Sequence, residues 1–288
     1  MTGHVLAPDT DRCRWCESHD LATLRERGKH RVLRCRRCGF LTLKTGIDES
    51  QLFDSYQDYL PLDAAAIAQW EHAQRPVIVR AVRELRRLAP GRSLLEVGAG
   101  FGFFLDRARS AGFDVHGLEF SAAGRRYAHD RFGLDLSDEP LERVSDGARF
   151  DVVCAFYLVE HLPNPRTFLR QAARALKPGG LLFLRWPHTT PLVRVLDAVG
   201  IRHDLYHAPW HLSDFTPATM ERAFAETGFE QVTTRTFGGT AIFGPIGTLG
   251  SRGIAALSEA LEIASGARLS LPGLTKTTFG YLPATTRA

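Results

Sequence analysis

Several features are missing from this sequence of 288 residues, and each absence excludes a class of protein. No run of about 18 uncharged apolar residues is present, which excludes a membrane-spanning helix. The opening residues, MTGHVLAPDTDRCRW, lack the apolar core of a signal peptide. No internal repeat is present either. We therefore expect a cytoplasmic protein with one α/β domain of about 200 residues and a small extra module.

Cysteine is also scarce, and the few cysteines that occur are grouped. Four of the five form the pairs Cys13-x2-Cys16 and Cys35-x2-Cys38. A disulfide framework needs an oxidising compartment, which nothing in the sequence indicates. Two Cys-x-x-Cys turns can instead place four sulfurs around one zinc ion. We expect residues 1–44 to be a zinc ribbon whose zinc is structural, because protein fills all four ligand positions.

Basic and acidic side chains are nearly equal in number over the chain, which carries a net charge of +4. Residues 1–44 contain ten basic and five acidic side chains, so the excess lies in the ribbon. A basic face of this kind contacts nucleic acid, a phosphorylated substrate or an acidic partner, or is simply solvated. The sequence leaves these readings open.

The remaining chain divides into a connector and a larger domain. Residues 45–90 predict a connector followed by helices, which Pro76 should break into two. Residues 91–288 alternate strand and helix patterns, as in a parallel sheet with crossover helices. Within this domain we expect segments 187–215 and 240–275 to cover the substrate.

A glycine-rich loop, Gly98-Ala99-Gly100-Phe101-Gly102, follows an expected strand and precedes an expected helix. That context is typical of a ligand-binding loop. A nicotinamide fingerprint requires glycine at position 103, where this chain has Phe103. Two acids accompany the loop. Glu96 precedes it by two residues, and Glu119 ends the next strand, where an acid binds ribose hydroxyls in doubly wound sheets.

With these motifs, residues 93–185 resemble class I S-adenosylmethionine-dependent methyltransferases. The resemblance implies an α/β fold with a mostly parallel, seven-stranded Rossmann-like sheet and helices on both faces, here preceded by the ribbon. It implies that Glu96 helps to hold the ammonium end of S-adenosylmethionine and that Glu119 binds both ribose hydroxyls. The cofactor contacts that it implies are Glu96, Gly98, Ala99, Gly100, Phe101, Gly102, Glu119, Phe120, Phe156 and Tyr157.

A histidine, His161, follows the next expected buried strand, at the edge where doubly wound sheets bind ligands. In O-methylating relatives a histidine here acts as general base. Some relatives bind a metal through a longer E-x-x-E-H pattern, but Tyr157 replaces the first acid here, which argues against a metal. The alternative is that His161 only hydrogen-bonds a neighbouring loop.

A second histidine cluster comprises His203, Tyr206, His207, Trp210 and His211. The run that follows it, HLSDFTPATMERAFAETGF, is similar to segments that lie over the substrate in many small-molecule methyltransferases. The cluster therefore lines a substrate pocket, shapes a lid or binds a metal. His207 and His211 are the second candidates for the base.

The resemblance implies methyl transfer from S-adenosylmethionine to a hydroxyl of a small molecule or glycan, such as a sugar or secondary metabolite. One alternative is RNA base methylation with the basic ribbon holding the RNA, although Trp15 and Phe40 are the only nearby aromatics for base stacking. A second is C-methylation of a sugar or keto substrate. A third is a binding protein without catalysis, against which the intact Glu96, glycines and Glu119 argue. The oligomeric state stays open.

Overall fold

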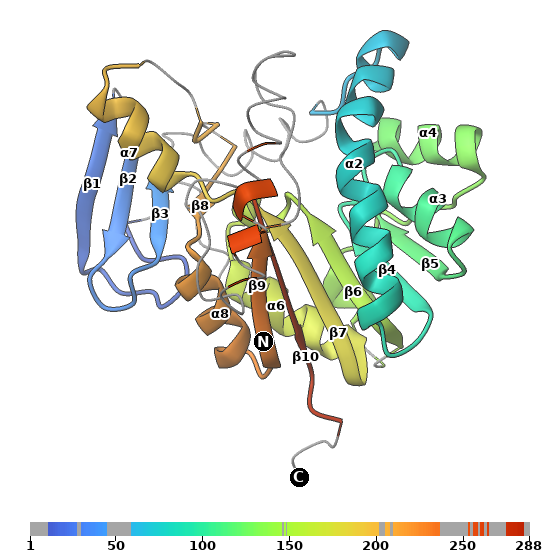
Figure 1. Cartoon of the computed structure of the whole chain (residues 1–288). Coiled ribbons are helices and arrows are strands. Elements are labelled where there is room, and N and C mark those ends of the chain that lie inside the picture. The colour runs from blue at the N-terminus through green and yellow to red at the C-terminus, as the bar shows by residue number, and fades with distance from the viewer. Residues whose placement is uncertain are drawn as a thin grey trace.

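The computed structural model of the chain describes residues 11–27, 30–44, 59–145, 147, 149–201, 205–207, 210–236, 253, 256–258, 260–261, 264 and 275–284. These residues form two sheets, and helices cover both faces of the larger one (Figure 1). None of the helices within these ranges combines the length and the apolarity that crossing a membrane requires.

The larger sheet contains six strands in the order β5-β4-β6-β7-β10-β9. The pairs β5-β4, β4-β6 and β6-β7 are parallel, whereas β10 runs antiparallel to both of its neighbours. The carboxyl ends of β4, β5, β6 and β7 therefore meet at one edge. The bounds are β4 Ser93–Val97, β5 Asp114–Leu118, β6 Phe150–Phe156, β7 Leu176–Trp186, β9 Glu230–Thr236 and β10 Lys276–Tyr281.

The prediction of an α/β fold with a mostly parallel sheet is confirmed, but the prediction of seven strands is wrong by one. Beyond β5, the edge carries a single parallel bridge between Leu118 and Ser137. Ser137 donates its backbone N–H to Gly117 and accepts from Glu119, at 3.0 and 2.9 Å. Pro140, which has no N–H to continue a ladder, then leads into helix α5, Leu141–Val144. The contact therefore ends before a strand forms.

Helices α2 (Ala64–Leu88), α3 (Phe103–Ser110) and α4 (Ala122–Phe132) cover one face of this sheet, and α6 (Pro165–Ala175) and α8 (Pro217–Glu226) cover the other (Figure 1). The expected break at Pro76 is wrong, because α2 runs through it as one helix. An apolar stripe continues directly after the proline and packs in the same core as α3. This packing offsets the lost hydrogen bond.

The smaller sheet joins the N-terminal module to the larger domain. Strands β1 (Leu21–Arg27), β2 (His30–Cys35) and β3 (Leu41–Lys44) form an antiparallel meander. Its fourth strand, β8 (Ser213–Asp214), comes from the segment after helix α7 (Thr190–Ala198). The ribbon is thus completed by residues far along the chain.

Side chains also bridge the two sheets. The rings of Phe40 and Phe215 meet edge to face with centroids 5.1 Å apart. Trp15 is 2% exposed and donates its indole N–H to Glu226 at 2.7 Å. Buried Arg14 donates to the carbonyl of Pro163 at 3.1 Å. The ribbon therefore shares one apolar core with the face of the larger sheet that carries α6 and α8.

We predict that Trp15→Ala lowers the free energy of unfolding by about 3–5 kcal/mol, the usual cost of removing a buried aromatic side chain. Trp15→Phe, the matched control, keeps an aromatic ring and loses only part of the buried volume together with the bond to Glu226, so it should cost less. Urea denaturation followed by circular dichroism measures both values. An unchanged midpoint in Trp15→Ala would show that the ribbon contributes nothing to the common core.

Candidate functional site

The glycine loop connects β4 to α3 at the carboxyl edge of the larger sheet. Gly98, Gly100 and Gly102 have φ values of 77°, 54° and 79°, a region that side chains other than glycine rarely adopt. A Cβ atom on Gly98 would also lie 3.3 Å from the Leu158 side chain. The backbone N–H groups of Gly98 and Ala99 both donate to Leu118 in β5. These two bonds hold the start of the loop against the end of β5.

Two carboxylates flank this loop in different environments. Glu96 is 3% exposed, and its Oε2 has no hydrogen-bond partner among the described residues. Burial, and then repulsion from Glu119, raises the pKa of Glu96 well above its ordinary value. Glu119 accepts hydrogen bonds from the backbone N–H groups of Gly100 and Ser121, at 2.6 and 2.7 Å. A buried acid without a partner suits a cationic ligand group that completes the site.

The aromatic residues assigned to the cofactor site occupy different positions around the loop. Phe101 is buried against Trp70 and Tyr127 below the loop. Phe120, after β5, is 40% exposed. Phe156 packs into the core, with its ring centroid 4.6 Å from that of Phe104. Of the three assigned phenylalanines, Phe120 is thus the exposed one.

Tyr157 follows β6 and has a φ of 54°, which is unusual for a residue with a side chain. Its hydroxyl accepts a hydrogen bond from Arg185 Nε at 2.8 Å, and the guanidinium also lies over the ring. Arg185 is 1% exposed and donates to Thr277 as well. A buried arginine thus orients the residue at the turn between β6 and His161.

His161 ends the short 3-10 helix η1, Val159–His161, and is almost fully buried. Its Nδ1 lies 3.1 Å from the backbone oxygen of Trp210. A carbonyl can only accept, so Nδ1 carries the proton and Nε2 carries the lone pair. Burial lowers the pKa of His161 to about 4, with an added effect of His207. The ring is therefore neutral at neutral pH.

The structure brings His211 and His207 to His161. The rings of His161 and His211 have centroids 4.7 Å apart, and those of His211 and His207 are 5.2 Å apart. His211 is buried, which lowers its pKa well below the ordinary value, whereas His207 is exposed. His203 lies outside the described residues. The three candidate bases thus form one cluster next to β6.

Glu160, which precedes His161, is fully buried, and neither of its carboxylate oxygens has a partner among the described residues. Burial raises its pKa to about 8, and repulsion from Asp214 contributes. The ligand atoms of Glu160, His161 and His211 lie within 4.8 Å of one another, close enough for a metal ion. Their chemistry fits either a metal or a proton-transfer group, so the expectation against a metal stays a prediction.

Asp214, which sequence reasoning missed, anchors the segment that carries His211. It accepts hydrogen bonds from the backbone N–H groups of Thr189 and Thr190 and from the Thr190 hydroxyl. Burial raises the pKa of Asp214 to about 6 despite these bonds. The motif Ser-Asp-Phe-Thr-Pro signals a helix start at Thr216, but no local pattern reveals that Asp214 fixes the beginning of α7 as well.

The ribbon reaches the histidine cluster through the backbone. Leu43 of β3 donates its N–H to the carbonyl of Leu212, and Leu212 donates to the carbonyl of Glu160, at 2.9 and 2.8 Å. These two bonds run from the ribbon through residue 212 to the residue beside His161. The position of the cluster therefore depends on the ribbon.

The cysteine cluster lies at the end of the smaller sheet. Sγ of Cys13 is 3.5 Å from that of Cys38, and Sγ of Cys16 is 3.6 Å from that of Cys35. All four sulfurs lie within 4.8 Å of one another. Four thiolates around zinc at 2.3 Å would be about 3.8 Å apart, so the spacing suits a tetrahedral site after small adjustments.

The two cysteine turns have the same backbone geometry. The N–H of Glu17 donates to Cys13, and the N–H of Gly39 donates to Cys35, at 2.9 and 2.8 Å. Glu17 and Gly39 each follow the second cysteine of a pair and both have positive φ, 58° and 73°. Two equivalent turns facing each other are the arrangement that a four-cysteine zinc site requires.

Comparison with known proteins agrees with this geometry. A family model described as a methyltransferase domain matches residues 70–234, more than half of the chain. A ubiquinone biosynthesis O-methyltransferase of Methylobacterium nodulans is 30% identical over 177 residues, which cover 57% of this chain and 70% of that protein. A protein of the same name from Bordetella avium is 27% identical over 48% of this chain. The chain spans 60% of the length of the Bordetella protein.

Solved structures show the same fold. A methyltransferase of Thermotoga maritima, described as S-adenosylmethionine-dependent and possibly a histamine N-methyltransferase, has a TM-score of 0.53 at 16% identity, covering 80% of this chain and 99% of that one. A methyltransferase of Archaeoglobus fulgidus described as dependent on the same cofactor has a TM-score of 0.51 at 17% identity, covering 72% and 94%. The chain belongs to the family of S-adenosylmethionine-dependent methyltransferases.

Proposed function

We propose that this protein transfers the methyl group of S-adenosylmethionine to a hydroxyl of a small molecule, such as a sugar or a secondary metabolite. The observation that carries this proposal is the glycine loop flanked by Glu119 and by Glu96, a buried acid whose Oε2 has no hydrogen-bond partner among the described residues. The names of the O-methylating relatives support an oxygen acceptor. A direct test incubates the protein with S-adenosylmethionine and extracts of the producing organism and reads new methyl groups by mass.

The residues around the loop fit the cofactor. Glu96 would receive its ammonium group, and Glu119 would exchange contacts with Gly100 and Ser121 for the two ribose hydroxyls. When bound, the cofactor supplies an activated methyl group on a positively charged sulfur. The protein then has to hold the acceptor in line with that methyl group, because orientation alone contributes a large rate factor.

The second task is removal of the acceptor's proton. His161 is neutral, and its Nε2 is the atom that accepts this proton. The hydrogen bond from Nδ1 to the backbone oxygen of Trp210 fixes the orientation of the ring. His207 and His211 are the next candidates. Their segment, residues 205–207 and 210–214, contacts Glu160 and His161 through Leu212 and Trp210 and would help to exclude water from the acceptor.

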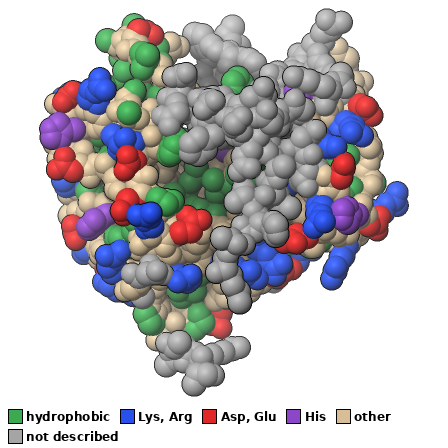
Figure 2. Space-filling view, turned by 180° about the vertical axis from the view of Figure 1, so that it is seen from behind, with side chains coloured by type: hydrophobic (Ala, Val, Ile, Leu, Met, Phe, Trp, Pro, Cys, Tyr) green, Lys and Arg blue, Asp and Glu red, His purple; other side chains and the backbone are tan. Residues whose placement is uncertain are grey.

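The RNA alternative is less well supported. Basic and acidic side chains are interspersed on the described part of the face in Figure 2, where no continuous basic stripe appears. C-methylation is distinguished by the product, since a methyl ether and a new carbon–carbon bond differ in NMR spectra. A protein that binds the cofactor but never turns it over would support the non-catalytic alternative.

We also propose a structural zinc ion on Cys13, Cys16, Cys35 and Cys38. The matching pair of turns and the close sulfurs support it, and zinc chemistry suits four thiolates. The sulfurs leave no ligand position for a substrate, so the ion would stabilise the ribbon and take no part in methyl transfer.

We predict that Glu119→Ala weakens S-adenosylmethionine binding about tenfold or more, because a hydrogen bond to a charged group contributes roughly 1.5–3 kcal/mol. Glu96→Gln should weaken it similarly by removing the negative charge. Isothermal titration calorimetry measures both. Glu142→Ala, an exposed acid on α5, is the matched control and should bind normally. Unchanged affinity in Glu119→Ala would remove Glu119 from the site.

We predict that His161→Ala lowers kcat by about 10²–10⁴-fold with little change in cofactor affinity. Because the lowered pKa keeps His161 neutral above about pH 4, the rate should rise with pH through about 4 and not near 6.5, the ordinary histidine value. His129→Ala, at an exposed histidine on α4, is the control. Elemental analysis should show no metal beyond the one zinc of the cysteine cluster, whereas a second metal ion that is lost in His161→Ala would assign Glu160, His161 and His211 to metal binding.

We predict one zinc per chain in protein prepared without chelator, and its loss in Cys35→Ser. Structural zinc contributes on the order of 10 kcal/mol to folding of a small module, so the variant should also unfold at lower temperature. Cys154→Ala, in β6, is the matched control and should retain zinc. Elemental analysis decides the matter, and metal-free wild-type protein with normal stability would refute the proposal.

A further inference from the structure

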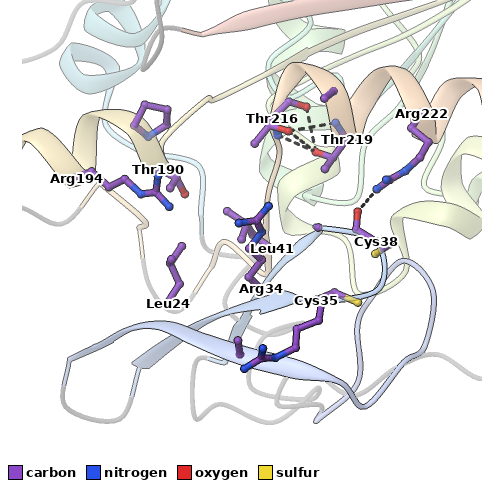
Figure 3. Close-up of a pocket in the computed structure, with 15 residues that line it drawn as sticks. Leu24, Arg34, Cys35, Cys38, Leu41, Thr190, Arg194, Thr216, Thr219 and Arg222 are labelled. Atoms are coloured by element: carbon purple, nitrogen blue, oxygen red, sulfur yellow. Dashed lines mark hydrogen bonds between the residues drawn. The ribbon is translucent and has the colours of Figure 1, made fainter.

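A cavity of about 790 Å³ lies between the ribbon and the two helices α7 and α8 (Figure 3). Strands β1, β2 and β3 form one wall, and α7 and the start of α8 form the other. Its volume is in the range of small-molecule sites, roughly 300–1,000 Å³. It is separate from the glycine loop, since none of the loop residues lines it. The proposed methyl transfer therefore leaves this cavity without a role.

The charge of the lining is one-sided. Arg34, Arg36, Arg194 and Arg222 line the cavity, and none of the described lining residues is acidic. All four arginines are exposed. Nε of Arg36 lies 3.5 Å from Oδ1 of Asp20, and Nε of Arg222 lies 3.6 Å from Oε1 of Glu226. Arg222 also donates a hydrogen bond to the Cys38 carbonyl. Those two guanidinium groups are thus partly neutralised.

Arg34 and Arg194 differ from the other two. Neither forms an ion pair with a carboxylate in the described part of the chain. Figure 3 shows both side chains in the space between the ribbon strands and the two helices, one from β2 and one from α7. Guanidinium groups that line one cavity from separate elements suit an anion with several oxygens, because each can bind in a bidentate manner.

The floor of the cavity is apolar. Leu24, Leu41 and Pro191 line it beside the arginines. Leu24 is 37% exposed, which is high for a leucine in an otherwise packed sheet. An inorganic anion would leave this apolar surface in water. A ligand with both an organic group and a charged group would cover the floor and meet the arginines.

The start of α8 adds to the positive field. Thr216 and Thr219, which line the cavity, cap this helix reciprocally. The N-terminal end of a helix favours negative charge, although this effect is smaller than that of two arginines. The arginines carry the argument, and the helix supports it.

We propose that this cavity is a second ligand site, which binds an organic phosphate ester. Arg34 and Arg194 would hold the phosphate, and Leu24, Leu41 and Pro191 would contact the organic group. Because the cavity walls come from both the ribbon and the larger domain, the ligand would bridge the two. This inference does not depend on the identity of the methyl acceptor.

The test uses the full-length protein and 1-naphthyl phosphate as the probe, followed by its fluorescence. Binding should weaken about tenfold or more in Arg34→Gln and in Arg194→Gln, since each removes a charged hydrogen bond. Uncharged 1-naphthol should bind at least tenfold more weakly than the phosphate. Arg107→Gln, an exposed arginine on α3 outside the cavity, is the matched control and should bind normally.

A second comparison separates the two halves of the ligand. Leu24→Ser should weaken naphthyl phosphate but leave inorganic phosphate unchanged, because only the organic group touches Leu24. All these substitutions are at exposed positions, so the variants should retain the wild-type melting temperature and cofactor affinity. Equal binding of the probe to wild type, Arg34→Gln and Arg194→Gln would overturn the proposal. Retention of single-stranded RNA through these arginines without binding of naphthyl phosphate would overturn it in favour of a nucleic-acid surface.

Discussion

The pairing of β3 with β8 is the contact on which the rest of the structure depends. Two residue pairs, Leu41 with Asp214 and Thr42 with Ser213, join the start of the chain to its second half. Through them the ribbon becomes part of a larger core and gains the burial that such a short module lacks alone. The same segment carries His211 and ends at the helix whose start lines the arginine-rich cavity. The pairing of β3 with β8 thus helps to position both the histidine cluster and the arginine-rich cavity.

The ionisable groups of the two proposed ligand sites differ in their burial. Around the glycine loop, polar groups are buried and their pKa values are displaced, as at Glu96, Glu160 and His161. Such displaced groups cluster where chemistry occurs, because burial and neighbouring charges set the protonation state. Around the cavity, the charged groups stay exposed. The first arrangement suits proton transfer, and the second suits recognition of a ligand.

Local patterns predict part of this structure well. The glycine loop, its two acids and the paired cysteines are recognisable because each depends on residues close together in sequence. Long-range contacts decided the rest. The edge of the sheet stops at Ser137, because one bridge forms and Pro140 follows. Helix α2 continues through Pro76, because its apolar stripe packs on both sides. Arg34 and Arg194 line one cavity only after β8 has joined the ribbon, so no window of sequence reveals that cavity.

Glu96 has a consequence for how the empty protein exchanges with its surroundings. Burial raises the pKa of this carboxyl, which favours its protonated form when nothing occupies the site. An ammonium group placed beside it favours the ionised form, so entry of the ligand shifts the carboxyl towards release of a proton. Under the proposed function, uptake of S-adenosylmethionine is therefore coupled to proton release, and its apparent affinity should increase as the solution becomes more alkaline. The raised pKa thus disfavours an uncompensated buried charge in the empty site.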